Sequence, residues 1–183
     1  TADLQKVYVV TGDHEITGEV STKANHTGGG SKSLVIGSSG FYQRTRNIRK
    51  FEESLTNVEI TVWVRANGPG TNERGVVRIR WEQAPPGPRD LLLAVWNSRD
   101  NFMYRDTLAG IGWTETEIPR EQGWHKLTVR VTENGSTLFI DDVEIYSSSD
   151  FKGVTYIDFA DEWGKPFEAM EPVYFDDLRV ETL

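Results

Sequence analysis

The 183-residue sequence contains no cysteine. Disulfides, thiolate metal sites and a cysteine nucleophile are therefore excluded. No uninterrupted apolar run approaches the roughly 20 residues that a membrane-spanning helix needs, so we expect no membrane insertion. Positive charge is in deficit, with 20 Lys and Arg against 28 Asp and Glu and a net charge of −8. This balance argues against nucleic acid as the partner.

Sustained helical periodicity is also absent, because no segment keeps a helical repeat over three turns. The chain instead shows short strand patterns separated by Gly, Pro and Asn turns. Its length and its hydrophobic content of 37% suit one domain with a sizeable core. We therefore expect residues 1–183 to form a single all-β domain, an antiparallel sandwich or barrel.

The clearest hairpin lies between Gly123 and Tyr146. Apolar residues at 127, 129 and 131 alternate with polar ones before the turn Glu133-Asn134-Gly135-Ser136. Asn and Gly tolerate positive φ best, which favours a tight turn here. A second turn is expected at Asp141-Asp142. A hairpin alone cannot bury its apolar face, so other strands must cover it.

Several other stretches read as strands. Residues 58–65 alternate between an apolar face and a face that carries Trp63 and Arg65. Residues 76–82 place Val77, Ile79 and Trp81 on the core face, and 91–96 form a continuous apolar run that suits a buried strand. Residues 109–116 are ambiguous. Further strands are expected at 6–10, 16–20, 33–36, 41–46, 102–105, 154–159 and 173–180.

Three groups of these residues resemble one fold family. Trp124-His125-Lys126-Leu127 followed by residues 137–143 is similar to a hairpin of concanavalin A-like and laminin-G-like jelly rolls. Residues 173–180 look like the closing strand of those folds, and residues 30–36 with 59–66 resemble segments of bacterial carbohydrate-binding modules. One departure is Asp141-Asp142, where the family most often has Asp-Gly. The resemblance implies an antiparallel jelly-roll β-sandwich of two packed sheets.

Jelly rolls of this kind serve as sugar-binding modules, glycoside hydrolases, polysaccharide lyases, and adhesion or spacer domains, so function must be argued from the site. The resemblance implies a bacterial protein that is secreted or displayed at the cell surface. It also implies that the chain is part of a larger multidomain protein, with a polysaccharide or oligosaccharide as its partner.

The predicted binding site lies on the faces of the middle strands that point away from the core. A sugar ring packs its C–H face on Trp or Tyr, and its hydroxyls or carboxylate accept from the planar donors of Arg. Arginine favours an acidic or a heavily hydroxylated glycan. The alternative is that Trp63 packs under a loop and the arginines pair with acidic residues. The predicted ligand-binding residues are Tyr42, Arg44, Trp63, Arg65, Arg78, Arg80, Trp96 and Tyr104.

Catalysis is the main alternative function. The jelly-roll hydrolases that the chain resembles carry a Glu-x-Asp-x-x-Glu strand, which this sequence lacks; Asp158, Asp161 and Glu162 are the nearest approach. A polysaccharide lyase needs an Arg, an amide and a His or Tyr beside the substrate carboxylate. Residues 42–44, Tyr-Gln-Arg, supply these types, with Tyr104 as a second tyrosine.

A structural calcium ion is the one cofactor that the resemblance implies, between an early acidic segment and the closing strand. The predicted ligands are Asp13 and Glu15 together with Asp176 or Asp177. Calcium takes hard oxygen ligands of this kind. The alternative is that these carboxylates are solvated or paired with arginine.

Overall fold

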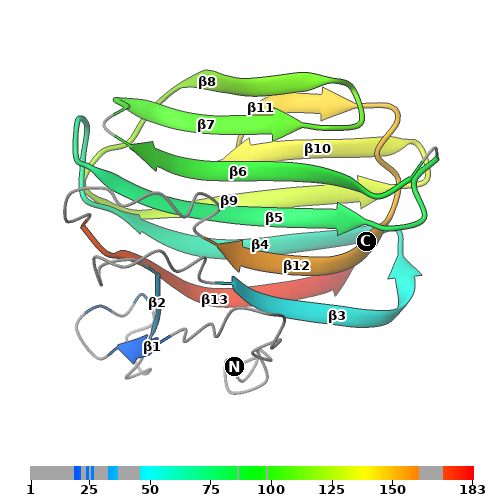
Figure 1. Cartoon of the computed structure of the whole chain (residues 1–183), viewed down its shortest axis with the longest axis horizontal. Coiled ribbons are helices and arrows are strands. Elements are labelled where there is room, and N and C mark those ends of the chain that lie inside the picture. Colours follow the sequence, from blue (N-terminus) through cyan, green and yellow to red (C-terminus); the bar gives the residue numbers. More distant parts are fainter. Residues whose placement is uncertain are drawn as a thin grey trace.

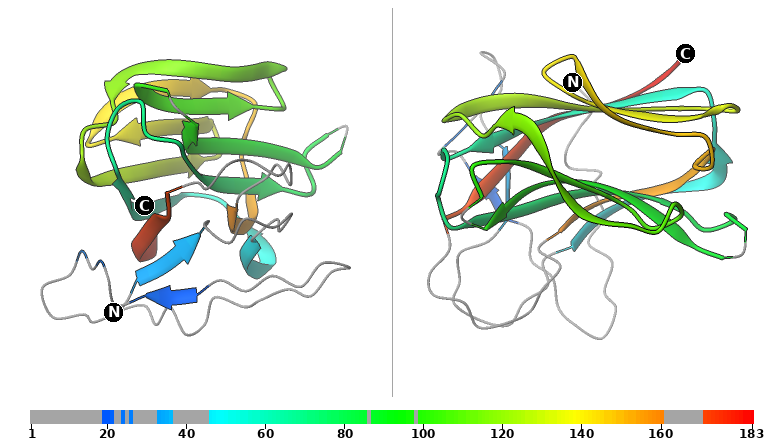
Figure 2. Two further views of the ribbon diagram at one scale, coloured as in Figure 1. Left: turned by 60° about the vertical axis from the view of Figure 1, so that its left-hand side comes forward. Right: turned by 90° about the horizontal axis from the view of Figure 1, so that it is seen from above.

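The computed structural model describes residues 19–21, 24, 26, 33–36, 46–85, 87–97, 99–160 and 171–183. Within these ranges the secondary structure is all β, in two sheets that pack face to face as a sandwich (Figures 1 and 2). The predicted strand at 6–10, and all but one residue of that at 41–46, lie outside the described residues. No helix in the described part of the chain is long and apolar enough to cross a membrane.

The first sheet has seven strands, every neighbouring pair of which is antiparallel. The closing strand β13 lies between β2 and β4, so residues near the two ends of the sequence are paired. In spatial order the strands are β1 (Glu19–Ser21), β2 (Ser33–Ile36), β13 (Val173–Thr182), β4 (Val58–Ala66), β9 (Gly123–Thr132), β10 (Gly135–Ile140) and β11 (Val143–Ser148).

The second sheet has six antiparallel strands and lies in front in Figure 1. In spatial order they are β3 (Arg46–Leu55), β12 (Val154–Ala160), β5 (Glu73–Trp81), β6 (Arg89–Asn97), β7 (Asn101–Asp106) and β8 (Ile111–Pro119). Strand β3 was not predicted beyond Arg46. Its sequence, RNIRKFEESL, is too charged to show an alternating apolar face.

The core fills the space between the two sheets. Strand β4 alternates strictly between buried and half-buried residues, as its sequence predicts. Val77 and Ile79 of β5 are buried in the same core, and Trp81 packs against it. Strand β6 is buried on both faces, which explains its continuous apolar run. The predicted jelly-roll sandwich agrees with this architecture.

The predicted hairpin and its second turn both form, with one correction of detail. Between β9 and β10 only Gly135 has positive φ, at 143°, whereas Asn134 does not need it. Between β10 and β11 both Asp141 and Asp142 have positive φ, at 49° and 66°. Asp141 compensates through its carboxylate, which accepts from the backbone N–H of Lys126 at 2.8 Å and lies 2.7 Å from Nδ1 of His125. The Asp-Asp pair thus builds the turn for which the family uses Asp-Gly.

Candidate functional site

The structure divides the predicted binding residues between the two sheets. Trp63 and Arg65 lie on β4 of the seven-stranded sheet. Arg78, Arg80 and Trp96 lie on β5 and β6 of the six-stranded sheet. The expected single groove is therefore not formed by all of them together. Tyr42 and Arg44 lie outside the described residues.

Tyr104 was predicted on the outer face, and that orientation is wrong. Its partner across the strand pair is Leu93, a core residue, and its ring stacks on Tyr146 of β11 at 4.8 Å between centroids. Tyr104 therefore packs into the space between the sheets. It is not available to a ligand on the outer face.

Arg78, Arg80 and Trp96 lie on the outer face of the six-stranded sheet. Cross-strand pairing aligns them with neighbours on adjacent strands, so that they form rows across the sheet. One row runs Tyr156, Arg80 and Asp90 across β12, β5 and β6. The next row contains Asp158 and Arg78. Further along β5 and β6 come an apolar row and then the pair of Arg74 and Trp96. The six residue steps from Arg74 to Arg80 span about 20 Å of strand. We call this surface the outer-face site. It consists of Arg74, Arg78, Arg80, Asp90, Trp96, Trp113, Tyr156 and Asp158.

One end of the outer-face site carries paired charges. Arg80 binds Asp90 through two hydrogen bonds, of 2.6 and 2.8 Å, and its guanidinium lies 5.3 Å from the ring centre of Tyr156. The hydrogen bond to Asp90 holds the pKa of Arg80 above its ordinary value. Arg78 lies 3.5 Å from Asp158. Arg78 and Asp158 are buried, so the partly exposed Arg80 and Asp90 are the donor and acceptor that this end presents, with little net charge.

The other end of the outer-face site is aromatic. The indoles of Trp96 and Trp113 stack with centroids 4.6 Å apart, and the guanidinium of Arg74 lies 4.7 Å from the Trp96 ring centre. The indole N–H of Trp113 is buried and has no hydrogen-bond partner within the described part of the chain. A ligand oxygen that reached it would satisfy this donor.

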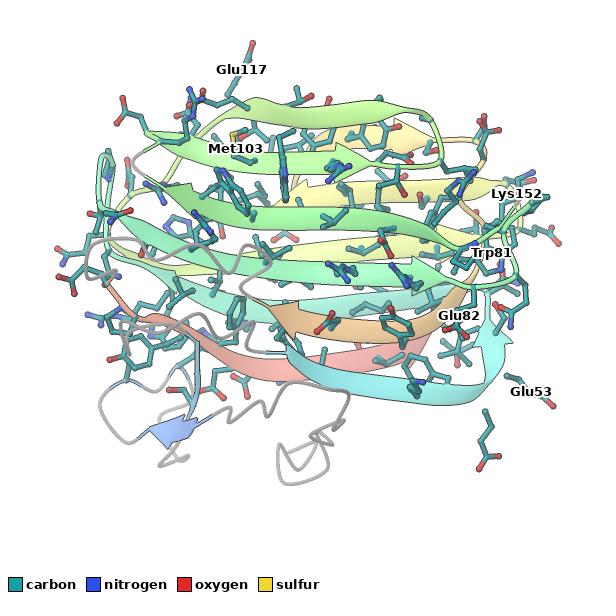
Figure 3. All side chains as sticks on the ribbon, viewed as in Figure 1. Glu53, Trp81, Glu82, Met103, Glu117 and Lys152 are labelled. Carbon is teal, nitrogen blue, oxygen red and sulfur yellow. The ribbon has the colours of Figure 1, made fainter. Side chains whose placement is uncertain are left out.

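An apolar floor joins the two ends. It consists of Val76, Leu92, Ala94 and Met103, a cluster separate from the main core, with Trp96 and Trp113 packed against it. Figure 3 shows Met103 on this face of the sheet. These four side chains are 0–5% exposed and do not reach a ligand themselves, whereas the half-buried Trp96 and Trp113 packed against them are the apolar groups of this face that a ligand can contact.

On the opposite sheet, Trp63 is covered by His26. The imidazole stacks on the indole with centroids 3.8 Å apart and an interplanar angle of 18°. The Trp63 side chain is thus packed under an early segment of the chain, which is the alternative that the sequence left open. Arg65 lies on the same face, opposite Trp124 of β9.

The predicted calcium ligands are only partly described. Asp13 and Glu15 lie outside the described residues. Asp176 is buried on β13, and its carboxylate oxygens accept from the backbone N–H groups of His26 and Asp177, both at 2.9 Å. No cluster of three or more His, Cys, Asp or Glu placed to hold a metal occurs within the described ranges. The calcium ion stays a prediction.

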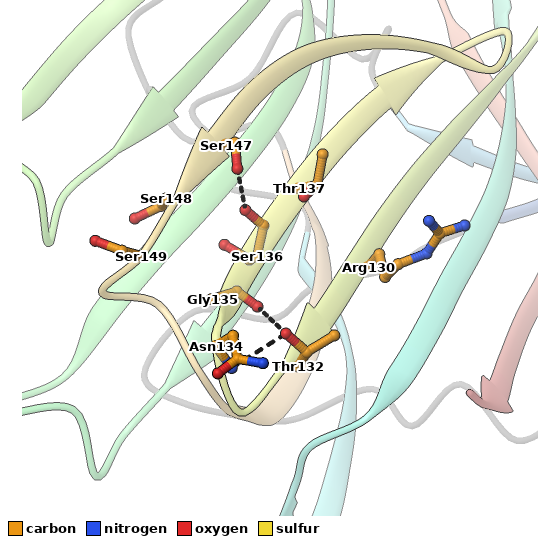
Figure 4. A pocket seen from close by; sticks show the side chains of 9 residues that line it. All are labelled: Arg130, Thr132, Asn134, Gly135, Ser136, Thr137, Ser147, Ser148 and Ser149. Atoms are coloured by element: carbon orange, nitrogen blue, oxygen red, sulfur yellow. Dashed lines mark hydrogen bonds between the residues drawn. The ribbon is translucent and has the colours of Figure 1, made fainter.

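A separate open pocket of about 270 Å³ lies beside the turn between β9 and β10 (Figure 4). Hydroxyl side chains dominate its lining, and none of its lining residues is aromatic. Its single cation, Arg130, is bound to Glu59 at 2.7 Å. Without an aromatic surface for a sugar ring, this pocket is a weaker candidate than the outer-face site.

The sequence reasoning missed part of the outer-face site. Trp113 lies in the stretch 109–116 whose sequence is ambiguous, but it belongs to β8 and stacks on Trp96. Tyr156 and Asp158 were not assigned to the binding face, although they alternate with the core residues Ile157 and Phe159. That alternation was the available signal. Their position beside Arg78 and Arg80 depends on the pairing of β12 with β5, which no local pattern reveals.

Comparison with known proteins identifies the fold. No protein-family model and no curated protein matches the sequence. Among solved structures, the cellulose-induced protein Cip1 matches with a TM-score of 0.66 at 13% identity, covering 93% of this chain and 88% of Cip1. A mixed-linkage-glucan glycoside hydrolase family 16 protein of Bacteroides ovatus matches with a TM-score of 0.61 at 11% identity, over 88% and 84% of the two chains. The carbohydrate-binding module CBM66 from Bacillus subtilis matches with a TM-score of 0.52 at 11% identity, over 91% and 92%. The chain therefore has the concanavalin A-like jelly-roll fold that its motifs predicted.

Proposed function

We propose that the chain is a non-catalytic carbohydrate-binding module that binds a polysaccharide on its outer-face site. The observation that carries this proposal is the stacked pair of Trp96 and Trp113 on the same sheet face as the Arg80–Asp90 pair. The indoles offer an apolar surface to the C–H face of a sugar ring. The ion pair offers donors and acceptors to its hydroxyls. Structural neighbours described as a carbohydrate-binding module and as a glucan hydrolase support a carbohydrate partner.

The charge pairing favours a heavily hydroxylated glycan over an acidic one. Asp90 already neutralises Arg80, and Asp158 lies beside Arg78. An acidic sugar would have to compete with these carboxylates, whereas a hydroxyl group can bind both partners of such a pair. Because polysaccharides of this kind lie outside cells, we also propose a secreted or surface-displayed parent protein with further domains.

Binding fits the site better than hydrolysis does. Asp90 and Asp158 are the carboxylates of the outer-face site, and they lie on strands either side of β5. Two strand spacings and a two-residue offset along β5 separate their backbones by about 12 Å. Retaining glycosidases need carboxyl groups about 5–5.5 Å apart, and inverting ones about 6.5–9.5 Å. Each carboxylate is also engaged by an arginine, Asp90 by Arg80 and Asp158 by Arg78.

Calorimetric titration with neutral and acidic polysaccharides tests the proposal. We expect binding of a neutral glycan, and a loss of at least about tenfold in affinity for Trp96→Ala and for Trp113→Ala, which corresponds to about 1.4 kcal/mol each. Phe139→Ala, at a half-buried position of β10 on the opposite sheet, is the matched control and should leave the affinity unchanged. The absence of binding, or equal affinity in all variants, would refute the proposal. Release of products, or new ultraviolet absorbance from an unsaturated sugar, would instead identify a hydrolase or a lyase.

A further inference from the structure

The contact between His26 and the closing strand depends on an irregularity in β13. The pairing of β13 with β4 shifts register between Asp176 and Arg179, and Asp177 has a φ of 49°. Consecutive residues of a regular strand point to opposite faces. At this bulge both carboxylates instead contact one residue: Asp176 accepts from the His26 backbone N–H at 2.9 Å, and Asp177 lies 2.7 Å from its Nδ1.

Two tryptophans complete the surroundings of His26. Its ring lies flat on Trp63, 3.8 Å away, and meets the edge of Trp124 at 5.7 Å between centroids. Both tryptophans are half-buried, on β4 and β9 of the seven-stranded sheet. The His26 side chain is 26% exposed, so the cluster is accessible from solvent.

This set of contacts matches what a sugar ring requires. A flat ring stacks on an indole while polar groups at its edge bind carboxylate oxygens. Backbone strain of the kind seen at Asp177, together with a bulge, is typical of functional sites. We propose that Trp63, Trp124 and Asp177 form a second saccharide subsite, which the side chain of His26 fills in the unliganded chain.

The second subsite lies on the opposite sheet from the outer-face site. Each of the two sites can therefore be tested and refuted separately. A ligand must displace the His26 ring, so the subsite binds weakly until that ring is removed. With both sites engaged, one copy of the chain would bridge two polysaccharide strands, because the outer faces of the two packed sheets point in opposite directions (Figure 2).

Calorimetry with cellotetraose tests this proposal in a Trp96→Ala/Trp113→Ala background, which removes the outer-face site. Adding His26→Ala should raise the affinity at least about tenfold, and adding Trp63→Ala as well should abolish the gain. No gain from His26→Ala, or a gain that survives Trp63→Ala, would overturn the proposal. The proposed function fails on a different result, namely unchanged affinity of the Trp96 and Trp113 variants in the otherwise native chain.

A second measurement covers the case in which His26→Ala does not fold. In the unmodified chain, the indole N–H resonances of Trp63 and Trp124 are assigned by nuclear magnetic resonance with single Trp→Phe variants. Saturating cellotetraose should shift both resonances. If neither of them moves while the resonance of Trp96 does, no second subsite exists.

Discussion

Replacing Arg120 by Met should destabilise the fold strongly, because it breaks a fully buried ion pair. Nη1 of Arg120 lies 3.1 Å from Oε1 of Glu73, and both side chains are 0% exposed. Arg120 also donates to the carbonyls of Thr71, at 3.3 Å, and of Arg99. The side-chain N–H of Asn67 donates to Glu73 at 2.7 Å. The pair thus connects the start of β5, the end of β8 and the turns beside them at one end of the sandwich.

The expected magnitude follows from what the variant leaves behind. Removing one partner of a buried pair costs about 3–5 kcal/mol, because the other charge stays buried without compensation. Burial already raises the pKa of Glu73 above its ordinary value of 4.5, although Arg120 opposes this rise. Burial lowers the pKa of Arg120 in the same way. Without Arg120, the ionised carboxylate is disfavoured further.

The cost should therefore depend on pH. The folded-state pKa of Glu73 lies above its unfolded value, so the unfolded chain releases this proton first as pH rises. This contribution to stability is fully present below about pH 4.5 and is lost as pH rises through the folded pKa. In Arg120→Met that pKa is higher, so the loss relative to the native chain should be larger at pH 7 than at pH 4.

Urea unfolding followed by tryptophan fluorescence at both pH values measures the effect, with equal m values required for the comparison. The loss should lower the thermal midpoint by about 6–20 °C at pH 7. Arg99→Met is the matched control, because Arg99 is exposed and lies 3.8 Å from Glu115 in a surface pair of little energetic consequence. Adding Glu73→Gln to Arg120→Met should restore part of the stability. A loss under about 1 kcal/mol, or an equal loss at both pH values, would refute this reasoning.

Three further predictions concern local structure. Asp142→Gly should stabilise the chain by up to about 1 kcal/mol in urea unfolding, since Asp142 has a φ of 66°; a clear loss would show that its contact with Lys126 matters more than the backbone. Gly135→Ala should destabilise it by more than 1 kcal/mol, because the added methyl group would collide with the carbonyl oxygen of Ser148; retention of the native midpoint would contradict this. Burial and the hydrogen bond to Asp106 raise the pKa of Tyr146 to about 12. Its unfolded form ionises near pH 10, so stability should fall between pH 10 and 12, and ultraviolet titration should show one late phenolate that Tyr146→Phe removes.

Patterns within one strand were predictable because alternation and turn chemistry are local. The two faces of β4, the turn at Asp141-Asp142 and the double burial of β6 all follow from neighbouring residues. The closing strand, β13, was also recognised from its own sequence, although it extends two residues further than expected.

Relations between strands were not predictable, because they depend on pairings of distant segments. Trp63 and Arg78 are 15 positions apart, yet β4 pairs with β9 and β13 while β5 pairs with β6 and β12. The sequence therefore could not show that these residues lie on different sheets. The contact of His26 with Asp176 joins residues 150 positions apart and leaves no local signal. The extent of the chain's single domain and its predicted calcium ion stay predictions.

The most direct test of the proposed function is the affinity of the Trp96→Ala variant for a neutral β-glucan, measured by calorimetry beside the native chain, the control Phe139→Ala and Trp124→Ala. The outer-face site predicts at least about tenfold weaker binding for Trp96→Ala, with Phe139→Ala unchanged. Binding that is unchanged in Trp96→Ala but lost in Trp124→Ala would place the glycan on the opposite sheet and contradict the proposal.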